Sequence, residues 1–461
     1  MKSGEKFSGT TFYALIFGLF LGLAVLKFGN PVILDSKITP PVSPSDFWND
    51  PWPARWANWG ILPLALAGAA IAFSKKWRWP ETKWLGLLPF LWFLWQLLSA
   101  TQTVDANLTA ATLWQLFGCV ACYFLGALVL GSEPLLRWLL IGVLAAFTVC
   151  LVRAVDQRIF EFPQSHQLLI EGERTDWTNF PPETRLEMKR ENVIITTNDV
   201  DVANPAVLAK FAKGRVNGTL VYPNALAGAI LLLFPVSLEL VFTRTNKLRP
   251  AIRQTAIALA LFLGGAAFFW TGSKLGWLIG IGIGVTCLYR LKWPARLKCV
   301  ALTMFLLIGL GIFAVRYQNY FASGATSVGA RFDYWHAAVQ ITFAHPWFGT
   351  GPGTFQRPYA QLKSPDAEMA RLTHNDYLEQ FSDTGVPGGI FYSAWILLTL
   401  IIVGRRVWCF GSPMTVAILF GLLGWFVQGI GEFSLYVPAL AWTAFTLLGC
   451  LAGTSGNQID K

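Results

Sequence analysis

Residues 254–289 read QTAIALALFLGGAAFFW, TGSK and LGWLIGIGIGVTCLY in succession, and Lys274 is the only charged residue among them. An α-helix that crosses the hydrocarbon core of a bilayer needs about 20 predominantly apolar residues. The two apolar runs, 254–270 and 275–289, approach that length, and only the short segment 271–274 separates them. The stretch therefore predicts two membrane-spanning helices joined by a tight hairpin.

Similar apolar runs recur along the whole chain of 461 residues, of which 54% are hydrophobic and 13% are charged. A soluble protein carries about 25% charged residues. The sequence predicts an all-α polytopic membrane protein with about 12 transmembrane helices and a folded outer loop that carries short helices. The spans are expected at 11–28, 59–73, 84–100, 110–130, 136–152, 224–242, 254–270, 275–289, 298–315, 387–403, 414–430 and 437–452.

Basic residues in the short loops between spans indicate the orientation of a membrane protein. With the N-terminus inside, all the basic clusters fall in inside loops, whereas the short outside loops 101–109 and 431–436 contain no Lys or Arg. We therefore interpret the net charge of +10 as an orientation signal and not as a nucleic-acid-binding surface. The inside clusters are Lys75, Lys76, Arg78 and Lys83; Arg244, Lys247, Arg249 and Arg253; Arg290, Lys292, Arg296 and Lys298; and Arg405 with Arg406.

This orientation predicts cytoplasmic termini and two long polar segments on the outer face of the membrane. The mixed charge of the first segment, as in residues 171–176, predicts a solvated surface, whereas the helical periodicity and aromatic content of the second predict a folded one. The expected regions are N-terminal transmembrane helices in 1–152, the first loop in 153–223, central helices in 224–315, the second loop with the candidate site in 316–386, and C-terminal helices in 387–461.

The predicted spans contain no Asp, Glu, Lys or Arg near their middles, and Glu239 comes closest. Ion-coupled transporters usually place ionisable groups near the midplane, so this pattern disfavours a transporter. The seven cysteines lie in or beside apolar runs and predict neither a disulfide framework nor a zinc site. Cys119 and Cys122, spaced as CxxC within a span, are interpreted as packing residues. Residues 1–26 are expected to be a retained helix and not a cleaved signal peptide.

Two polar elements lie at the expected outer ends of spans. Residues 214–227 read GRVNGTLVYPNALA and contribute Arg215, while Pro223 and Asn224 are typical of a helix start. Residues 271–274 place Ser273 and Lys274 in the tight hairpin. The Lys274 ammonium either binds a phosphate group or simply extends to the membrane interface.

A third element, residues 331–345, predicts an amphipathic helix that starts with Arg331 and ends before Pro346. Trp335, Ala338, Val339 and Thr342 share one face at helical spacing. The glycine-rich segment 347–355 follows, and such loops can bind phosphate, although one alone is a weak signal.

The fourth element, residues 371–379, reads RLTHNDYLE. Thr373 and Asp376 resemble a capping box, which would place His374 at the positive end of a helix, where the dipole disfavours a protonated imidazole. A neutral histidine can accept a proton from an attacking hydroxyl. Taken alone, however, a single histidine such as His374 more often makes a structural hydrogen bond.

In this order, the four elements resemble the bacterial O-antigen ligase family over residues 214–452. The resemblance implies glycosyl transfer without a metal or cofactor, from a glycan on undecaprenyl pyrophosphate, at the periplasmic face of the bacterial inner membrane. The acceptor would be lipid A core for a ligase, another repeat unit for a polymerase, or a protein Ser or Thr. The resemblance also implies two catalytic residues, His374 and Arg331. It implies four substrate-binding residues, namely Lys274, Ser273, Arg215 and Asn375.

Lys274 stands where family members usually have an arginine after serine. The positive charge is kept, but the guanidinium that could bind a phosphate through two parallel hydrogen bonds is lost. The expected partners are the lipid-linked donor, the acceptor and membrane lipid, with no nucleic acid. Three alternatives remain open: a polymerase of the same family, a polysaccharide transporter or flippase, and a non-catalytic subunit of a polysaccharide export complex.

Overall fold

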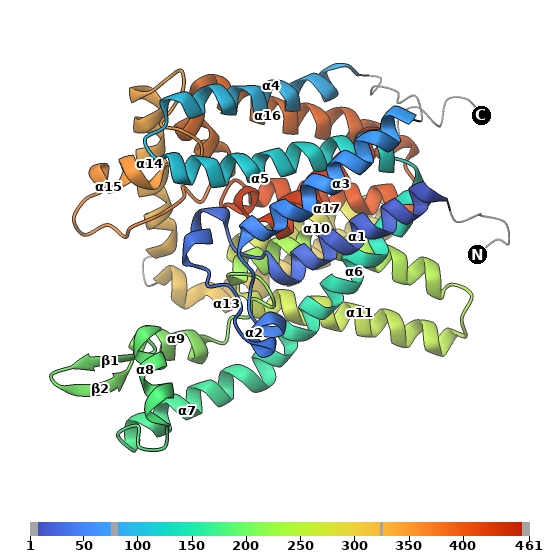
Figure 1. Cartoon of the computed structure of the whole chain (residues 1–461). Coiled ribbons are helices and arrows are strands. Elements are labelled where there is room, and N and C mark those ends of the chain that lie inside the picture. Colours follow the sequence, from blue (N-terminus) through green and yellow to red (C-terminus); the bar gives the residue numbers. More distant parts are fainter. Residues whose placement is uncertain (1–7, 75–81, 323–325, 454–461) are drawn as a thin grey trace.

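The computed structural model describes residues 8–74, 82–322 and 326–453, and these segments are mostly helical (Figure 1). Lys75, Lys76 and Arg78 of the first predicted basic cluster lie outside the described residues. So do the two ends of the chain, 1–7 and 454–461, whose cytoplasmic location stays a prediction.

Each of the twelve predicted spans coincides with a helix, which confirms the all-α polytopic fold class. Nine described helices are long and apolar enough to cross a membrane, whereas α12, α17 and α18 have 17, 16 and 16 residues. A count of twelve crossings therefore stays a prediction. The helices are α1 Gly9–Lys27, α3 Ala54–Ser74, α4 Trp84–Ser99, α5 Ala106–Leu125, α6 Glu133–Asp156, α10 Pro223–Thr245, α11 Pro250–Thr271, α12 Lys274–Arg290, α13 Ala295–Ala322, α16 Asp376–Phe410, α17 Pro413–Gln428 and α18 Pro438–Gly453.

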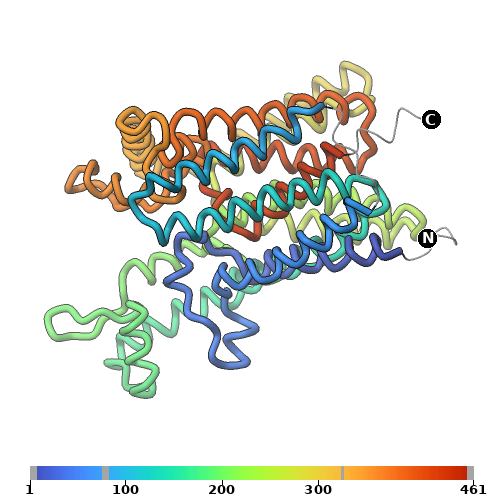
Figure 2. Tube along the Cα trace, turned by 45° about the horizontal axis from the view of Figure 1, so that its top comes forward, coloured from blue at the N-terminus to red at the C-terminus, as the bar shows by residue number. Residues whose placement is uncertain are grey.

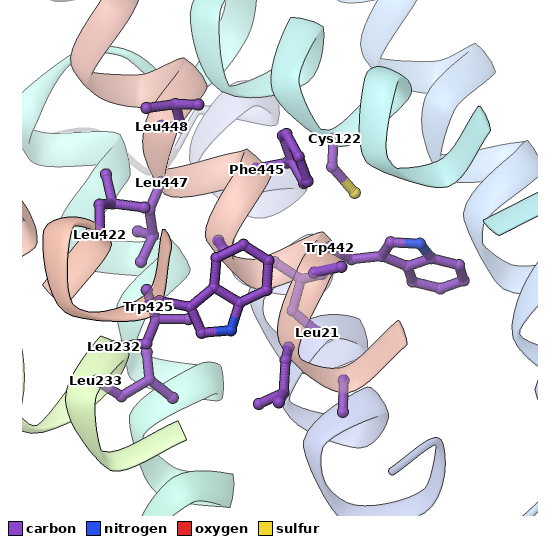
Figure 3. Packing of buried hydrophobic residues seen from close by; sticks show 14 of the residues in the cluster. Leu21, Cys122, Leu232, Leu233, Leu422, Trp425, Trp442, Phe445, Leu447 and Leu448 are labelled. Atoms are coloured by element: carbon purple, nitrogen blue, oxygen red, sulfur yellow. The ribbon is translucent and has the colours of Figure 1, made fainter. Parts of the chain in front are cut away.

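The core of the bundle is built around α18, in which nearly every residue is buried. Trp442 and Phe445 of α18 lie among side chains of α1, α5 and α17 (Figure 3). Helices in a membrane pack through small residues that let backbones approach closely. A Cβ on Gly421 of α17 would lie 2.0 Å from the carbonyl oxygen of Leu232 in α10, so any larger residue there would force these two helices apart.

The first long polar segment folds into a small unit that stands apart from the bundle (Figures 1 and 2). A π-helical turn, Gln157–Glu161, continues α6 into α7 (Phe162–Arg174). Then follow α8 (Pro182–Arg190), the antiparallel hairpin of β1 (Ile194–Thr197) and β2 (Val200–Ala203), and α9 (Pro205–Lys213).

The charged run 171–176 is mostly exposed, in agreement with the expected solvated surface, but the unit also has a core of its own that was not predicted. Trp177 is only 1% exposed and packs with Leu169, Ile194 and Ala203. The indole of Trp177 donates a hydrogen bond to the carbonyl of Asp201 at 2.8 Å. The charged residues around it cover a small apolar centre that the mixed composition hides.

The second long segment is folded, as its periodicity predicts. It contains α14 (Thr326–Ala344) and α15 (Gln356–Leu362), and α14 lies across the ends of the spanning helices (Figure 1). The predicted apolar face of α14 is correct for Ala338 and Thr342, which are buried, but Val339 is 40% exposed. The buried face instead includes Tyr334 and Ile341, which are displaced from Val339 around the helix.

Reporter fusions at Thr82 and Asp366 are expected to report opposite sides of the membrane. Thr82 precedes α4, and Ser99 at the far end of α4 donates a hydrogen bond to the carbonyl of Phe348. The sixteen residues of α4 span about 24 Å at the helical rise of about 1.5 Å per residue. Alkaline phosphatase and green fluorescent protein fusions would measure this, and the same side for both sites would contradict the predicted topology.

Candidate active site

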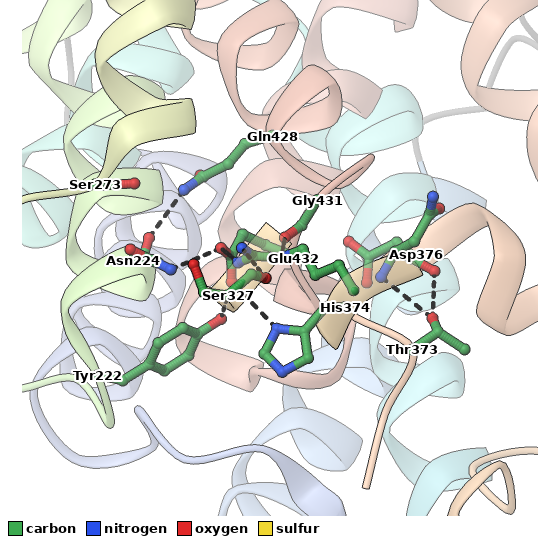
Figure 4. Close-up of polar contacts among 12 residues, drawn as sticks. Tyr222, Asn224, Ser273, Ser327, Thr373, His374, Asp376, Gln428, Gly431 and Glu432 are labelled. Atoms are coloured by element: carbon green, nitrogen blue, oxygen red, sulfur yellow. Dashed lines mark hydrogen bonds and ion pairs between the residues drawn. The ribbon is translucent and has the colours of Figure 1, made fainter. Parts of the chain in front are cut away.

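Three chain segments meet around Glu432, which lies in the short connection between α17 and α18 and is 1% exposed (Figure 4). One carboxylate oxygen, Oε1, accepts hydrogen bonds from Asn224 Nδ2 and Arg331 Nη2, both at 2.7 Å. The other oxygen, Oε2, accepts from the hydroxyl of Tyr222 at 3.0 Å and lies 3.7 Å from His374 Nδ1. Burial and the adjacent Glu432 raise the pKa of Tyr222 well above its ordinary value, so Tyr222 remains a donor.

The connection that carries Glu432 is held against the start of α16. The N–H of Asp376 donates to the carbonyl of Gly429 at 2.7 Å, and the N–H of Leu435 donates to the Asp376 carboxylate at 3.2 Å. Arg331 Nε donates to the carbonyl of Gly431 at 3.1 Å. These bonds on either side of Glu432 fix its position relative to His374.

His374 lies just before α16, and its backbone has a φ of +52°. Left-handed backbone is uncommon outside glycine and clusters at functional sites. The predicted capping box is wrong, because Asn375 is the N-cap and its side chain accepts from the N–H groups of Tyr377 and Leu378. The Thr373 hydroxyl instead donates to the carbonyl of Asn375 at 2.8 Å. His374 therefore lies outside the first helical turn, and the side chain that faces it is Glu432.

The imidazole of His374 lies between two aromatic rings and is 30% exposed. Its centroid is 5.9 Å from that of Tyr334 and 4.7 Å from that of Phe433. At 3.7 Å from Glu432, Nδ1 is at ion-pair distance and beyond hydrogen-bonding distance. The other ring nitrogen points away from Glu432 (Figure 4).

Three cations approach this centre from different elements. The Arg215 guanidinium donates to the carbonyl of Thr271 at 2.7 Å and to Asn224 Oδ1 at 2.9 Å. Lys274 Nζ lies 3.7 Å from the ring centroid of Tyr320, and no described carboxylate is within ion-pair distance of it. Burial, together with the charges of Arg215 and Arg331, lowers the pKa of Lys274 to about 8. Arg215, Lys274 and Arg331 against the single carboxylate of Glu432 leave an excess of positive charge, which suits an anionic group.

The structure gives two other predicted binding residues clear structural roles. Ser273 is buried and caps α12, since its hydroxyl oxygen accepts from the N–H of Gly276 at 3.3 Å. Asn375 caps α16 in the same way. Both lie next to cluster members, Lys274 and His374, and their direct contact with substrate stays a prediction.

The glycine-rich segment 347–355 does not present its amides to a phosphate. The N–H of Gly353 donates to the carboxylate of Asp383 at 2.6 Å, and that of Gly351 donates to the Asp383 carbonyl at 2.8 Å. The segment instead packs against a kink in α16, where Thr384 and Gly385 have non-helical backbone. A Cβ on Gly349 would lie 2.3 Å from the carbonyl carbon of Asp383, so the glycines allow this close approach.

Sequence reasoning missed Glu432, the centre of the arrangement, and assigned Asn224 only to a helix start. Pro223 does begin α10, but the side chain of Asn224 bridges Arg215 and Glu432. One signal was available: Glu432 is the only charged residue between Arg406 and Asp460. An isolated carboxylate in a short loop that is otherwise apolar needs a partner when it is buried.

Within the described segments, no group of three or more His, Cys, Asp and Glu side chains is arranged to hold a metal ion. The seven cysteines are all free thiols, and Cys119 and Cys122 are buried among packing residues.

Comparison with known proteins bears on the same segments. The model of the O-antigen ligase family matches residues 259–393, which include Lys274, Arg331 and His374. Arg215 and Glu432 lie outside the matched range. A search of curated proteins found no match. The family match confirms the resemblance carried by the ordered motifs, and it shows that residues 259–393 of this multi-spanning membrane protein are similar to the O-antigen ligase family.

Proposed function

We propose that the chain is a membrane glycosyltransferase that moves a glycan from undecaprenyl pyrophosphate to an acceptor hydroxyl, as an O-antigen ligase in surface polysaccharide biosynthesis. One observation carries the proposal: His374 faces the buried Glu432 beside the three cations Arg215, Lys274 and Arg331. In the predicted topology, this site lies at the periplasmic face of the bacterial inner membrane.

His374 would act as the general base. The acceptor oxygen attacks the anomeric carbon of the donor sugar while the outward-facing ring nitrogen of His374 takes the hydroxyl proton. The imidazolium that forms is stabilised by Glu432, which also selects the tautomer with a proton on Nδ1. Glu432 thus positions the base and does not itself contact the substrate.

The cations would stabilise the leaving group. The bond between the anomeric carbon and the pyrophosphate oxygen breaks, and negative charge builds up on the departing polyprenyl pyrophosphate. An arginine has five N–H donors. Three atoms of the Arg331 guanidinium donate to Gly431, Ser327 and Glu432, so this side chain is held in place with donor capacity remaining. Lys274, which has no carboxylate partner in the described segments, has its charge available for phosphate oxygens.

Lys274→Ala is expected to lower glycan transfer about 10- to 100-fold, the weight of one charged hydrogen bond. Lys274→Arg keeps the charge and should keep most of the activity. The measurement is transfer by purified variants in lipid vesicles. Lys210→Ala, which removes an exposed cation of α9 on the same side of the protein, is the matched control. Full activity of Lys274→Ala would instead show that the ammonium merely extends to the interface.

The transporter alternative has one point in its favour. The candidate span Asp376–Phe410 contains the buried carboxylates Asp376, Glu379 and Asp383. They all precede the kink at Thr384 and Gly385, and so lie before the predicted span 387–403. Each carboxylate also accepts a backbone N–H, from Leu435, Thr373 and Gly353 respectively. We therefore interpret them as groups that hold the loops of the site.

The decisive experiment is glycan transfer by the purified protein in lipid vesicles, with a polyprenyl-pyrophosphate-linked glycan, an acceptor glycolipid and a metal chelator. Product formation supports the proposal, and a strict requirement for divalent metal would contradict the mechanism. The glycan profile of a deletion strain then separates the two family activities. Unmodified core with polymer on the lipid carrier indicates a ligase, whereas single repeat units on core indicate a polymerase.

A further inference from the structure

A large cavity lies at the end of the bundle opposite the candidate active site. Its volume is about 1160 Å³. α10 starts at the site with Pro223 and Asn224, whereas the cavity is lined by its later turns, from Phe234 to Thr243. α11, α12, α13 and α17, with the loops next to them, supply the other walls. This volume exceeds the usual range for small-molecule sites, about 300–1,000 Å³. The cavity therefore suits a lipid better than a small ion.

The polar end of this cavity carries more positive than negative charge. Arg253, Arg290 and Lys292 line it together with one carboxylate, Glu239. Two buried atoms there have no hydrogen-bond partner within the described segments, namely Arg253 Nε and Glu239 Oε2. Buried polar atoms are normally satisfied, so these two are left with unused hydrogen-bonding capacity beside the cavity. Arg290 is held in place, since its Nη1 donates to the carbonyl of Trp408 at 2.6 Å.

The other end of the cavity is apolar and continues along the bundle. Phe234, Ile283 and Phe305 line both this cavity and a second hollow of about 430 Å³, which extends toward Trp277 and Ile308. Glycines on α12 keep the passage open, because a Cβ on Gly284 would lie 2.4 Å from the ring of Phe305. The result is an apolar groove with a cationic end, which matches the division of a phospholipid into chain and headgroup.

We propose that this cavity binds one anionic phospholipid of the leaflet opposite the active site. Its phosphate lies among Arg253, Arg290 and Lys292, and a headgroup hydroxyl donates to Glu239 Oε2. An acyl chain follows the groove past Phe234 and Phe305. Basic pockets between transmembrane helices on the cytoplasmic side characteristically bind anionic headgroups, and in the predicted topology this end is cytoplasmic. The inference does not depend on the proposed glycosyl transfer.

The test is retention of lipid by the full-length protein. The protein is reconstituted in vesicles of phosphatidylethanolamine and phosphatidylglycerol at a 3:1 ratio, extracted in detergent, washed and analysed by native mass spectrometry. The wild-type protein should keep about one phosphatidylglycerol per chain. Arg253→Gln and Arg290→Gln should each weaken retention about fivefold, the weight of one basic residue at an anionic membrane surface.

The controls separate this site from general attraction to basic loops. Arg244→Gln and Arg249→Gln remove cations from the same predicted inside loop, outside the cavity lining, and should retain phosphatidylglycerol as the wild type does. Arg253→Lys keeps the charge and should retain most of the bound phosphatidylglycerol. This variant keeps the proposal testable if Arg253→Gln fails to fold. Equal losses in cavity and control variants, or retention of phosphatidylethanolamine in preference, would overturn the proposal.

Discussion

Replacing His374 is expected to lower the rate of glycan transfer by about 10²–10⁴-fold, the usual contribution of a general base. His374→Asn is the sharper variant, since asparagine tolerates the left-handed backbone at this position (φ +52°) whereas alanine adds strain there. The side chain is 30% exposed, so its loss should leave the bundle folded. Transfer would be measured with purified variants in lipid vesicles, and folding by thermal unfolding and size-exclusion chromatography.

The other histidines supply the controls for this prediction. His336 is exposed and pairs with Gln340 one turn along α14, and His345 follows the end of that helix before Pro346. His166 lies on α7, in the separate unit formed by α7, α8, α9 and the hairpin. His336→Ala, His345→Ala and His166→Ala should therefore retain near-normal transfer. Near-normal transfer by both His374→Asn and His374→Ala would remove the catalytic assignment.

The positions of the helices followed from the sequence because apolar length is a direct requirement of the bilayer. The predicted span 275–289 lies within α12, and the predicted break at 271–274 is the observed turn. The segment 157–213 was harder to predict. Its few apolar side chains, among them Trp177 and Ile194, come together only in the folded unit, and no periodicity marks them.

The start of α16 shows a different limit. The polar run Asp376 to Asp383 was assigned to an outer loop, because carboxylates are costly in lipid. In the structure this run is helical and buried by protein, and its carboxylates accept backbone N–H groups. Sequence hydropathy measures compatibility with lipid and cannot detect partners supplied by distant loops. The choice of Asn375 over Thr373 as N-cap was also open, since both residue types cap helices well.

The site residues also divide into those that local motifs indicate and one whose partners are distant in the sequence. Arg331, Lys274 and His374 were predicted as candidate site residues, because each belongs to a short motif whose order along the chain is informative, and their roles stay predictions. The central role of Glu432 could not be predicted, since Tyr222, Asn224, Arg331 and His374 reach it from other parts of the chain. Only the folded chain shows that one carboxylate lies against His374 and also pairs with Arg331.

Glu432→Gln is expected to lower glycan transfer by about 10²-fold or more and to destabilise the protein. The carboxylate is 1% exposed and pairs with Arg331, whose side chain is 22% exposed. Removing one partner of a buried ion pair costs about 3–5 kcal/mol, because the other charge is left without compensation. Thermal unfolding would measure this loss. A Tm equal to that of the wild type would show that Glu432 does not hold Arg331 in the folded protein.

A double-mutant cycle distinguishes a positioning role of Glu432 from a purely structural one. If Glu432 acts through His374, the two residues form one unit and their effects on transfer are not additive. The variant with both His374→Asn and Glu432→Gln should then transfer glycan about as slowly as His374→Asn alone. If Glu432 serves only to hold Arg331 and the loop between α17 and α18, the two losses should multiply. Assays at saturating donor and acceptor would separate kcat from KM, and a Glu432→Gln effect confined to KM would contradict the assignment of Glu432 to the base.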